Sequence, residues 1–334
     1  MKLSYSSVIL MLLVSLAACS ENQPDNEAAP DTVPGEIGAA AEPFKLSLAQ
    51  WSLHKRYMDE GGDPYQFAAH AKEMGFDGIE YVSVIYGDDF EEGEGYAASV
   101  KTVFDSLHRI ADSVGIEEVL IMVDAQGELA DLNEPDRKSA VSKHQLFVDV
   151  AARSGIPTIR VNAGGEQLRT VASAAEARAQ AVKSLRALGE YAAATGDGVN
   201  VVVENHGGYS SDPAWLRDVM AEVALDNVGI LPDFGNWCRR RVDPKVWEKG
   251  CEDELSADSI YAAVGMWMPY AHAVSAKSYA FDDAGNETKI DYVRMLDTVM
   301  ARGYDGFVGV EYEGEAPEPE GIAATRDLLR GQMK

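Results

Sequence analysis

The stretch Asn200-Val-Val-Val-Glu-Asn-His-Gly-Gly208 combines an apolar run with a group of reactive side chains. Three valines in a row are typical of a strand that is buried on both faces, as in a parallel sheet. A carboxylate and an imidazole follow at once, and burying such groups costs free energy unless a partner compensates them. Because side chains alternate along a strand, Glu204 and His206 are expected on the same face. The stretch therefore predicts a buried strand that ends in a metal or acid/base site.

Strand-like runs of this kind alternate with helical patterns eight times along the chain. They span residues 45–54, 78–84, 118–124, 158–162, 200–204, 228–233, 271–277 and 306–311. Eight strand–helix units predict a single-domain (β/α)₈ TIM barrel over residues 43–334, since such barrels typically take about 250 residues. A doubly wound open sheet is the alternative. It needs a glycine-rich loop after the first strand, where this chain has His54-Lys-Arg-Tyr-Met58.

Polar side chains collect where the predicted strands end. In a TIM barrel the carboxyl ends of all strands meet on one rim, and that rim carries the active site. The residues at these ends are Gln50, Trp51, His54, Asp124, Arg160, Asn162, Glu204, His206, Asp233, Asn236, Lys277 and Glu311. A purely structural rim has no reason to gather so many polar groups, so the sequence predicts a functional site there.

Three of these residues, Glu204, Asp233 and Glu311, are carboxylates. Close together on one rim, they repel one another and raise one another's pKa unless a cation lies among them. A divalent metal ion is the simplest solution, and oxygen-rich ligation favours Mn²⁺, Mg²⁺ or Co²⁺, with Zn²⁺ as an alternative. The competing interpretation is that each acid forms a salt bridge with a neighbouring arginine.

From Phe44 to Lys334 the chain resembles the xylose-isomerase-like TIM barrels, which include sugar isomerases and epimerases, inosose dehydratases and the endonuclease IV relatives. The resemblance is carried by Ser47-Leu-Ala-Gln-Trp-Ser-Leu-His54, Val203-Glu-Asn-His-Gly-Gly208, Asp233-Phe-Gly-Asn236, Val274-Ser-Ala-Lys277 and Gly309-Val-Glu-Tyr-Glu-Gly314. Ketose 3-epimerases of this family hold a metal with a Glu, an Asp, a His and a Glu, and the two glutamates move the proton beside the carbonyl. The resemblance thus implies that Glu204 and Glu311 are ligands and acid/base groups, and that Asp233 is a ligand.

The seventh strand departs from the family pattern. The place of the ligating histidine is taken by Ser275, two residues before Lys277. His206 is the predicted replacement ligand because it shares a face with Glu204. A water in the fourth position and a site without metal are the alternatives. His272 is odd-spaced from Lys277, so strand alternation places the two on opposite faces.

Other rim residues are expected to bind substrate. Arg160, Asn162 and Asn236 are predicted to orient sugar oxygens, and Asn236 stands where these epimerases have a histidine that touches substrate. Lys277 is predicted to stabilise an enediolate charge or, with a pKa lowered by burial, to act as a base.

Two of these roles have structural alternatives. Trp51 and His54 are both predicted to bind substrate. Trp51 suits stacking on a sugar face and suits core packing equally well. Arg160 could instead form an ion pair inside the barrel with Asp124 or Glu204.

The N-terminus predicts export. The apolar run 8–18 follows Lys2, is too short to span a membrane and ends in small residues, as secretory signals do. Leu16-Ala-Ala-Cys19 resembles the lipobox of bacterial lipoproteins, which implies that residues 1–18 are removed and Cys19 is lipidated. An ordinary signal peptide is the alternative. Residues 19–42 have almost no large apolar side chain and are predicted to be a disordered tether.

The resemblance to a lipoprotein implies an anchor in the inner or outer membrane of a Gram-negative bacterium, with the protein on the periplasmic side. Cys238 and Cys251 would lie in an oxidising compartment, where a disulfide between them is an open alternative to two free thiols. A formal net charge of −26 leaves nothing basic to meet phosphates, so no nucleic acid partner is expected and an endonuclease is disfavoured.

The leading functional hypothesis is a metal-dependent sugar isomerase or epimerase that moves a proton next to a carbonyl. Export and the lack of a helix-capped glycine loop argue for an unphosphorylated sugar or sugar derivative. The same proton chemistry serves β-elimination, so a 3-keto-glycoside lyase or hydratase is the runner-up. A non-catalytic periplasmic sugar-binding protein is the alternative outside enzymes.

Overall fold

The computed structural model describes residues 44–196, 198–243 and 249–333, which lie in one compact unit, Glu42–Lys334. The predicted signal peptide, the lipidation site Cys19 and the tether lie outside the described residues. In the described part of the chain, no helix is both long and apolar enough to cross a membrane.

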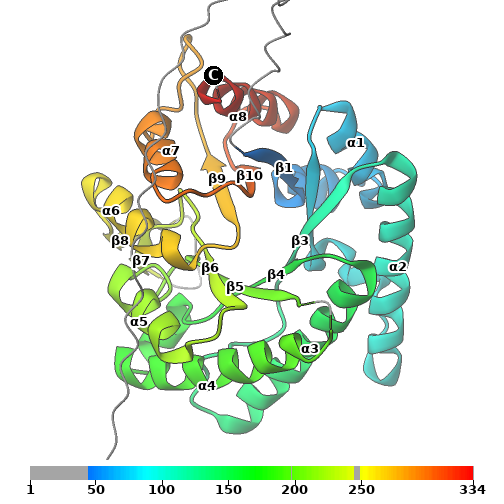
Figure 1. Ribbon diagram of the computed structural model, residues 1–334, viewed down its shortest axis with the longest axis vertical. Coiled ribbons are helices and arrows are strands. Elements are labelled where there is room, and N and C mark those ends of the chain that lie inside the picture. The colour runs from blue at the N-terminus through cyan, green and yellow to red at the C-terminus, as the bar shows by residue number, and fades with distance from the viewer. Residues whose placement is uncertain (1–43, 197, 244–248, 334) are drawn as a thin grey trace, which may run out of the picture. The chain divides into compact units, whose positions relative to one another are not determined.

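Eight parallel strands form the centre of this unit (Figure 1). Their order is β6-β5-β4-β3-β2-β1-β10-β9, and isolated bridges from Ile230 to Ala271 and from Asp233 to Ser275 join β6 to β9. The strands are β1 (Lys45–Ala49), β2 (Gly78–Val82), β3 (Glu117–Val123), β4 (Thr158–Val161), β5 (Asn200–Glu204), β6 (Val228–Leu231), β9 (Val274–Ser278) and β10 (Phe307–Tyr312). The predicted TIM barrel is confirmed.

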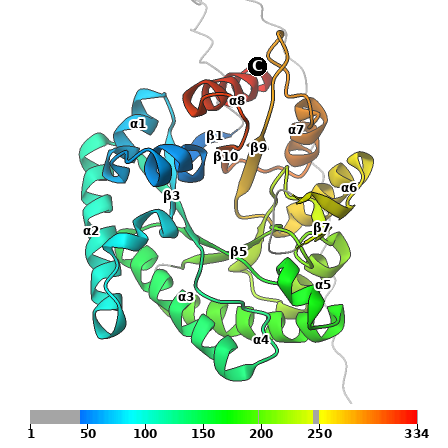
Figure 2. The same ribbon diagram turned by 180° about the vertical axis from the view of Figure 1, so that it is seen from behind.

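Helices surround the strands and cover their outer faces (Figures 1 and 2). They are α1 (Phe67–Glu73), α2 (Tyr96–Val114), α3 (Glu134–Ser154), α4 (Ala174–Ala193), α5 (Pro213–Val223), α6 (Ala257–Trp267), α7 (Tyr292–Met300) and α8 (Glu318–Gln332). Local sequence sets their ends. Ser173 and Glu176 form a reciprocal capping box at the start of α4, and Asp212 caps α5 just before Pro213.

Short helical turns connect several of these elements. They are η1 (Gln50–Leu53), the π-helix η2 (Lys55–Asp59), η3 (Pro64–Gln66), η4 (Ser83–Asp89), η5 (Gly93–Gly95), η6 (Glu166–Thr170) and η8 (Met268–Tyr270). The first of them shortens the predicted first strand, which ends at Ala49 instead of His54.

The apolar side chains form two layers. The larger lies between strands and helices and includes the outward-facing Val201 and Val203 of β5, while a small inner cluster includes Val202 and Leu231. Strand alternation therefore turns Glu204 inward, at the carboxyl end of the barrel. The inner apolar layer is the floor on which the polar rim rests.

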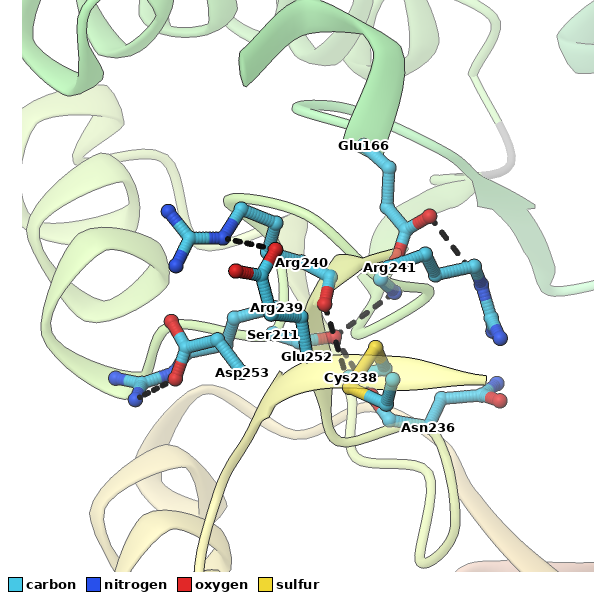
Figure 3. The surroundings of a disulfide bond; sticks show 11 residues. Glu166, Ser211, Asn236, Cys238, Arg239, Arg240, Arg241, Glu252 and Asp253 are labelled. Carbon is cyan, nitrogen blue, oxygen red and sulfur yellow. Dashed lines mark hydrogen bonds and ion pairs between the residues drawn. A yellow bond between two sulfur atoms is a disulfide. The ribbon is translucent and has the colours of Figure 1, made fainter. Parts of the chain in front are cut away.

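A two-stranded antiparallel ribbon interrupts the pattern between β6 and α6. It consists of β7 (Cys238–Arg241) and β8 (Cys251–Glu254). A disulfide joins Cys238 to Cys251, with Cα atoms 5.8 Å apart (Figure 3). Arg239 pairs with Asp253, Arg240 with Glu252, and Arg241 with Glu166.

Candidate active site

Glu204, Asp233 and Glu311 meet at the carboxyl end of the barrel. Glu204 ends β5, Asp233 follows β6, and Glu311 lies near the end of β10. Each offers one carboxylate oxygen, and the three oxygens lie within 4.8 Å of one another. All three side chains are buried. The structure thus brings together the three carboxylates that the sequence predicted to converge.

Glu204 is held by an ion pair and a hydrogen bond. Arg160 places Nε 2.9 Å from one oxygen of Glu204, and Asn236 donates from Nδ2 to the other at 2.9 Å. Arg160 also places Nη1 2.5 Å from Asp124. The ion pair considered for Arg160 inside the barrel is therefore formed, and with both acids. Asn162 donates to Asp124 at 2.7 Å and is not among the residues that line the central cavity.

Ser275 stands between the other two carboxylates. Its Oγ lies 2.6 Å from Asp233 Oδ2 and 3.0 Å from Glu311 Oε2. A serine hydroxyl carries one proton, so it can donate to only one of these acids at a time. Burial raises the pKa of Asp233 to about 6 and the pKa of Glu311 well above its usual range. The pair therefore binds a shared proton or a cation readily.

Lys277 lies beside Glu311 and is itself buried. Its Nζ is 3.4 Å from Glu311 and 3.1 Å from Glu313. Burial by itself lowers the pKa of Lys277, but Glu311 and Asp233 together raise it well above its usual range. The side chain is therefore an ammonium ion that can stabilise negative charge. The predicted alternative, a neutral lysine base, does not fit these neighbours.

Sequence reasoning missed two residues of the site. Glu313 accepts hydrogen bonds from Trp51 Nε1 at 2.5 Å and contacts Lys277; although burial raises the pKa of Glu313, Lys277 and Trp51 lower it. Asn205 clamps Asp233: its Nδ2 donates to the Asp233 carbonyl at 3.0 Å, and its Oδ1 accepts from the Asp233 N–H at 2.8 Å. The spacing of Glu313 from Glu311 was the available signal, because alternate residues share a face.

The rings of Trp51 and His54 stack on each other with centroids 4.6 Å apart. His54 Nδ1 lies 2.7 Å from the Trp51 carbonyl oxygen. Both side chains are only partly buried and line the central cavity, so Trp51 presents an aromatic surface there in addition to packing.

His206 is placed differently from the expectation. Among the residues that the structure describes, the carboxylate cluster consists of Glu204, Asp233 and Glu311, and His206 is exposed at the wall of the cavity. The reason is that β5 ends at Glu204. The backbone then turns through Gly207 and Gly208, with φ of 85° and 66°, so strand alternation no longer fixes where the imidazole points. Ser275 occupies the space beside the cluster instead.

The cavity above the cluster has a volume of about 500 Å³. This is within the range of about 300–1,000 Å³ that is usual for small-molecule sites. Its walls are formed by Trp51, His54, Lys55, Val84, Asp124, Arg160, His206, Asn236, Lys277, Glu311 and Glu313. The cavity thus joins Glu311, two buried cations and an aromatic face, while Glu204 and Asp233 are not among its lining residues.

The residues present fit a divalent metal ion. Three buried carboxylates face two buried cations, Arg160 and Lys277, and the buried Glu80 adds a further acid deeper in the barrel. Carboxylate and hydroxyl oxygens are the donors that Mg²⁺ and Mn²⁺ prefer. Glu204, Asp233 and Glu311 would hold the ion, with the Ser275 hydroxyl beside them in place of an imidazole.

Solved structures of several proteins share this fold. One is the apo 3-keto-D-glucoside 4-epimerase of E. coli, with 18% identity, a TM-score of 0.61, and coverage of 86% of this chain and 99% of the other. Another is a xylose isomerase-like TIM barrel protein from Mycobacterium smegmatis in complex with magnesium, with 18% identity, a TM-score of 0.60, and coverage of 87% and 96%. A third is a probable 3-DHS dehydratase from Bacillus anthracis, with 17% identity, a TM-score of 0.57, and coverage of 86% and 99%.

No curated protein matches the chain by sequence. The model of the family described as "Xylose isomerase-like TIM barrel" matches residues 68–332, which is well over half of the chain. That match agrees with the eight parallel strands and with the site at their carboxyl ends. The chain therefore belongs to the xylose isomerase-like TIM barrel family.

Proposed function

We propose that the protein is a metal-dependent isomerase or epimerase that acts on an unphosphorylated sugar or sugar derivative by proton transfer next to a carbonyl. The observation that carries the proposal is the meeting of Glu204 and Glu311, from strands β5 and β10, next to a cavity that Glu311 and the buried ammonium of Lys277 line. The similar structures of sugar epimerases support the reaction class.

The two glutamates are in different environments. Arg160 forms an ion pair with Glu204 and Asn236 donates a hydrogen bond to it, and these contacts orient the carboxylate that would act as a base. Glu311, 3.4 Å from the Lys277 ammonium and 3.0 Å from the Ser275 hydroxyl, is the candidate for the acid that returns a proton. Glu204 would thus abstract the proton beside the carbonyl, and Glu311 would deliver one.

Fixed positive charge opposes the charge that develops on the sugar. Lys277 and Arg160 are buried and held by acids, so they stabilise an enediolate oxygen without rearranging. A divalent ion, when bound, would supply further polarisation of the carbonyl and hydroxyl oxygens. Trp51 offers its ring to the apolar face of the sugar.

The decisive experiment replaces each glutamate by its amide. Glu204→Gln and Glu311→Gln should each lower exchange of the substrate C–H with solvent deuterium by roughly 10²–10⁴-fold, the usual contribution of general acid–base catalysis. Exchange is followed by NMR on a panel of ketoses and 3-keto-sugars, with metal added. Glu190→Gln, at an exposed position of α4, is the matched control and should retain full exchange. Normal exchange in either active-site variant would contradict the two-glutamate mechanism.

A lyase is the second candidate. The dehydratase from Bacillus anthracis shares the fold, and abstraction of the same proton followed by loss of a β-substituent gives elimination. Product analysis separates the two: an isomerase or epimerase conserves the mass of the sugar, whereas a lyase or hydratase releases an alcohol or changes the mass by one water.

We also propose that the protein is exported and anchored by lipid at Cys19. The proposal is supported by the signal-like residues 1–18 and by the Leu16-Ala-Ala-Cys19 sequence. The disulfide between Cys238 and Cys251 suits an oxidising compartment.

A further inference from the structure

A second cavity lies directly beside the catalytic one. Its volume is about 570 Å³, and it is bounded by the segment 83–96, by the loop after β3 and by Lys143 of α3. Val84 lines both cavities. The two cavities therefore lie next to each other, with Val84 between them.

The loop after β3 connects the two cavities. Asp124 faces the catalytic cavity, and the next residues, Ala125 and Gln126, line the second one. Ala125 has φ of 59° and is one of two non-glycine residues with positive φ in the described part of the chain. Such backbone strain is kept where the surroundings require it, often at functional sites. The Asp124 N–H also donates to Ser83 Oγ at 3.0 Å, which ties this loop to the opposite wall.

The lining has the chemistry of a carbohydrate site. The rings of Phe90 and Tyr96 pack edge to face, 5.8 Å apart, and both remain partly exposed. Tyr96 donates to Gln126 Oε1 at 3.0 Å, and Gln126 Nε2 donates to the Asp124 carbonyl at 3.1 Å. The Gln126 amide keeps one further N–H and one lone pair for a ligand hydroxyl. Aromatic faces with a few such polar groups suit a sugar ring.

We propose that this second cavity binds the second ring of the substrate, so that the substrate is a neutral disaccharide-like glycoside of a keto-sugar. The inference rests on the proposed function, since it places the carbonyl-bearing ring above Glu204 and Glu311. Two carboxylates, Glu91 and Glu92, against the single Lys143 make the second cavity unsuited to an anionic group. A neutral sugar ring satisfies both the aromatic walls and this charge.

Gly87 allows the second cavity to be filled without disturbing the fold. It lines the cavity, and a Cβ added there meets no heavy atom within 4 Å. Gly87→Phe therefore adds a ring at the wall of the second cavity. Gly331→Phe is the matched control: it also meets no atom within 4 Å, and it lies in α8 and lines neither cavity.

The test compares one-ring and two-ring ligands. For the 3-keto derivatives of maltose, cellobiose and trehalose, Gly87→Phe should lower kcat/KM of solvent-deuterium exchange by about tenfold or more, the scale of a pocket misfit. For 3-keto-D-glucose it should leave kcat/KM unchanged. The Gly331→Phe control should match the wild type with every sugar. An equal fall for one-ring and two-ring sugars, or no fall for any, overturns the inference.

Direct binding distinguishes this inference from the proposed reaction. Calorimetric titration with the three parent disaccharides should show binding that Gly87→Phe weakens and Gly331→Phe does not. If that result appears without any deuterium exchange, the second cavity stands and the proposed reaction falls. If the wild type exchanges 3-keto-D-glucose but binds no disaccharide more tightly than that sugar, the reaction stands and the second cavity falls.

Discussion

Ser275 offers a single hydroxyl proton to two buried acids, Asp233 and Glu311. Because it can donate to only one of them at a time, the other needs a further proton or a cation. Its oxygen is 2.6 Å from Asp233 and 3.0 Å from Glu311. An imidazole at this position would be a neutral ligand, whereas the hydroxyl is both a donor and a weak oxygen ligand. A serine in place of the histidine therefore changes which groups compensate the charge of the carboxylates, while the carboxylates themselves stay in place.

Ser275→Ala removes that donor and should destabilise the protein most when no metal is present. The free energy of unfolding in EDTA should fall by about 1–3 kcal/mol, the cost of leaving buried polar groups unpaired. Saturating Mn²⁺ should reduce the loss, because the cation then compensates the acids. Urea unfolding with and without metal measures both values.

The control for that variant is Ser278→Ala. Ser278 is also buried on β9, but its hydroxyl bonds to Thr325 and not to the carboxylate cluster. Its loss of stability should be the same in EDTA and in Mn²⁺. A metal-independent loss for Ser275→Ala as well would contradict the role given to its hydroxyl.

Glu80 is a further buried acid. Its titration should dominate the pH dependence of the free energy of unfolding between about pH 4.5 and about pH 7. Burial raises its pKa from 4.5 to about 7, and Ser47 donates to it at 2.6 Å. The folded state then holds a proton that the unfolded chain releases, so the stability that this group contributes falls as pH rises from about 4.5 to about 7.

Glu80→Gln removes that titration, so the free energy of unfolding should fall less steeply as pH rises from about 4.5 to about 7. The amide keeps the shape of the side chain, so the free energy of unfolding near pH 7 should rise by up to a few kcal/mol relative to the wild type. At pH 4.5 the two proteins should be similar. Chemical denaturation across this pH range provides the measurement, and parallel curves would remove Glu80 from the explanation.

At the scale of elements, the β7–β8 ribbon supports the wall that carries Asn236. Cys238 lies two residues after Asn236, and its carbonyl accepts from the Gly208 N–H at 3.2 Å. Asn236 in turn donates to Glu204. The disulfide thus fixes the ribbon on which the hydrogen bond from Asn236 to Glu204 depends.

Replacing both cysteines should therefore affect stability and activity together. Cys238→Ser/Cys251→Ser should lower the free energy of unfolding by about 2–4 kcal/mol, the usual effect of a disulfide. Deuterium exchange should also slow, because Asn236 is held less firmly against Glu204. Thermal unfolding and NMR exchange measure the two effects, and dithiothreitol should change the wild type in the same direction. Unchanged exchange with lowered stability would restrict the disulfide to a structural role.

Strands were predictable where a repeating pattern of apolar residues marks them in the sequence. The valines before Glu204, and the similar runs before Asp233 and Glu311, predict buried strands because β-branched residues and period-2 faces are local signals. Their convergence followed from the barrel. The structure differs where the chain leaves regular geometry: Gln50–Leu53 turn into a 3₁₀ helix, and the backbone bends at Gly207 after β5. Strand alternation in the sequence could therefore not predict where the His206 side chain lies.

Contacts between distant segments were the least predictable. The clamp of Asn205 on Asp233 and the bond from Trp51 to Glu313 each join residues on separate elements. Such pairs depend on register and on side-chain rotamers, which one sequence does not specify. The three carboxylates and the ion pair of Arg160 could be named in advance, but not the hydrogen bond from Asn236 to Glu204 or the position of Ser275 between Asp233 and Glu311.

For the whole molecule, the proposed lipid anchor makes its own prediction. Cys19→Ser removes the thiol that would carry lipid, so the protein should move from the membrane fraction to the soluble fraction on cell fractionation. The barrel is unchanged by this substitution, and deuterium exchange by the purified protein should be normal. A variant that stays with the membrane would show that another feature anchors it.

The seam between β6 and β9 links catalysis to the integrity of the barrel. The strands on either side are joined only by isolated bridges among the described residues, and one of these bridges pairs Asp233 with Ser275. The mutual repulsion of Glu204, Asp233 and Glu311 therefore acts where β6 and β9 meet, which is the least extensively paired pair of neighbouring strands. A cation bound between these acids would hold that pair of strands together. Metal binding and the free energy of unfolding should therefore rise together, because the ion binds the folded state.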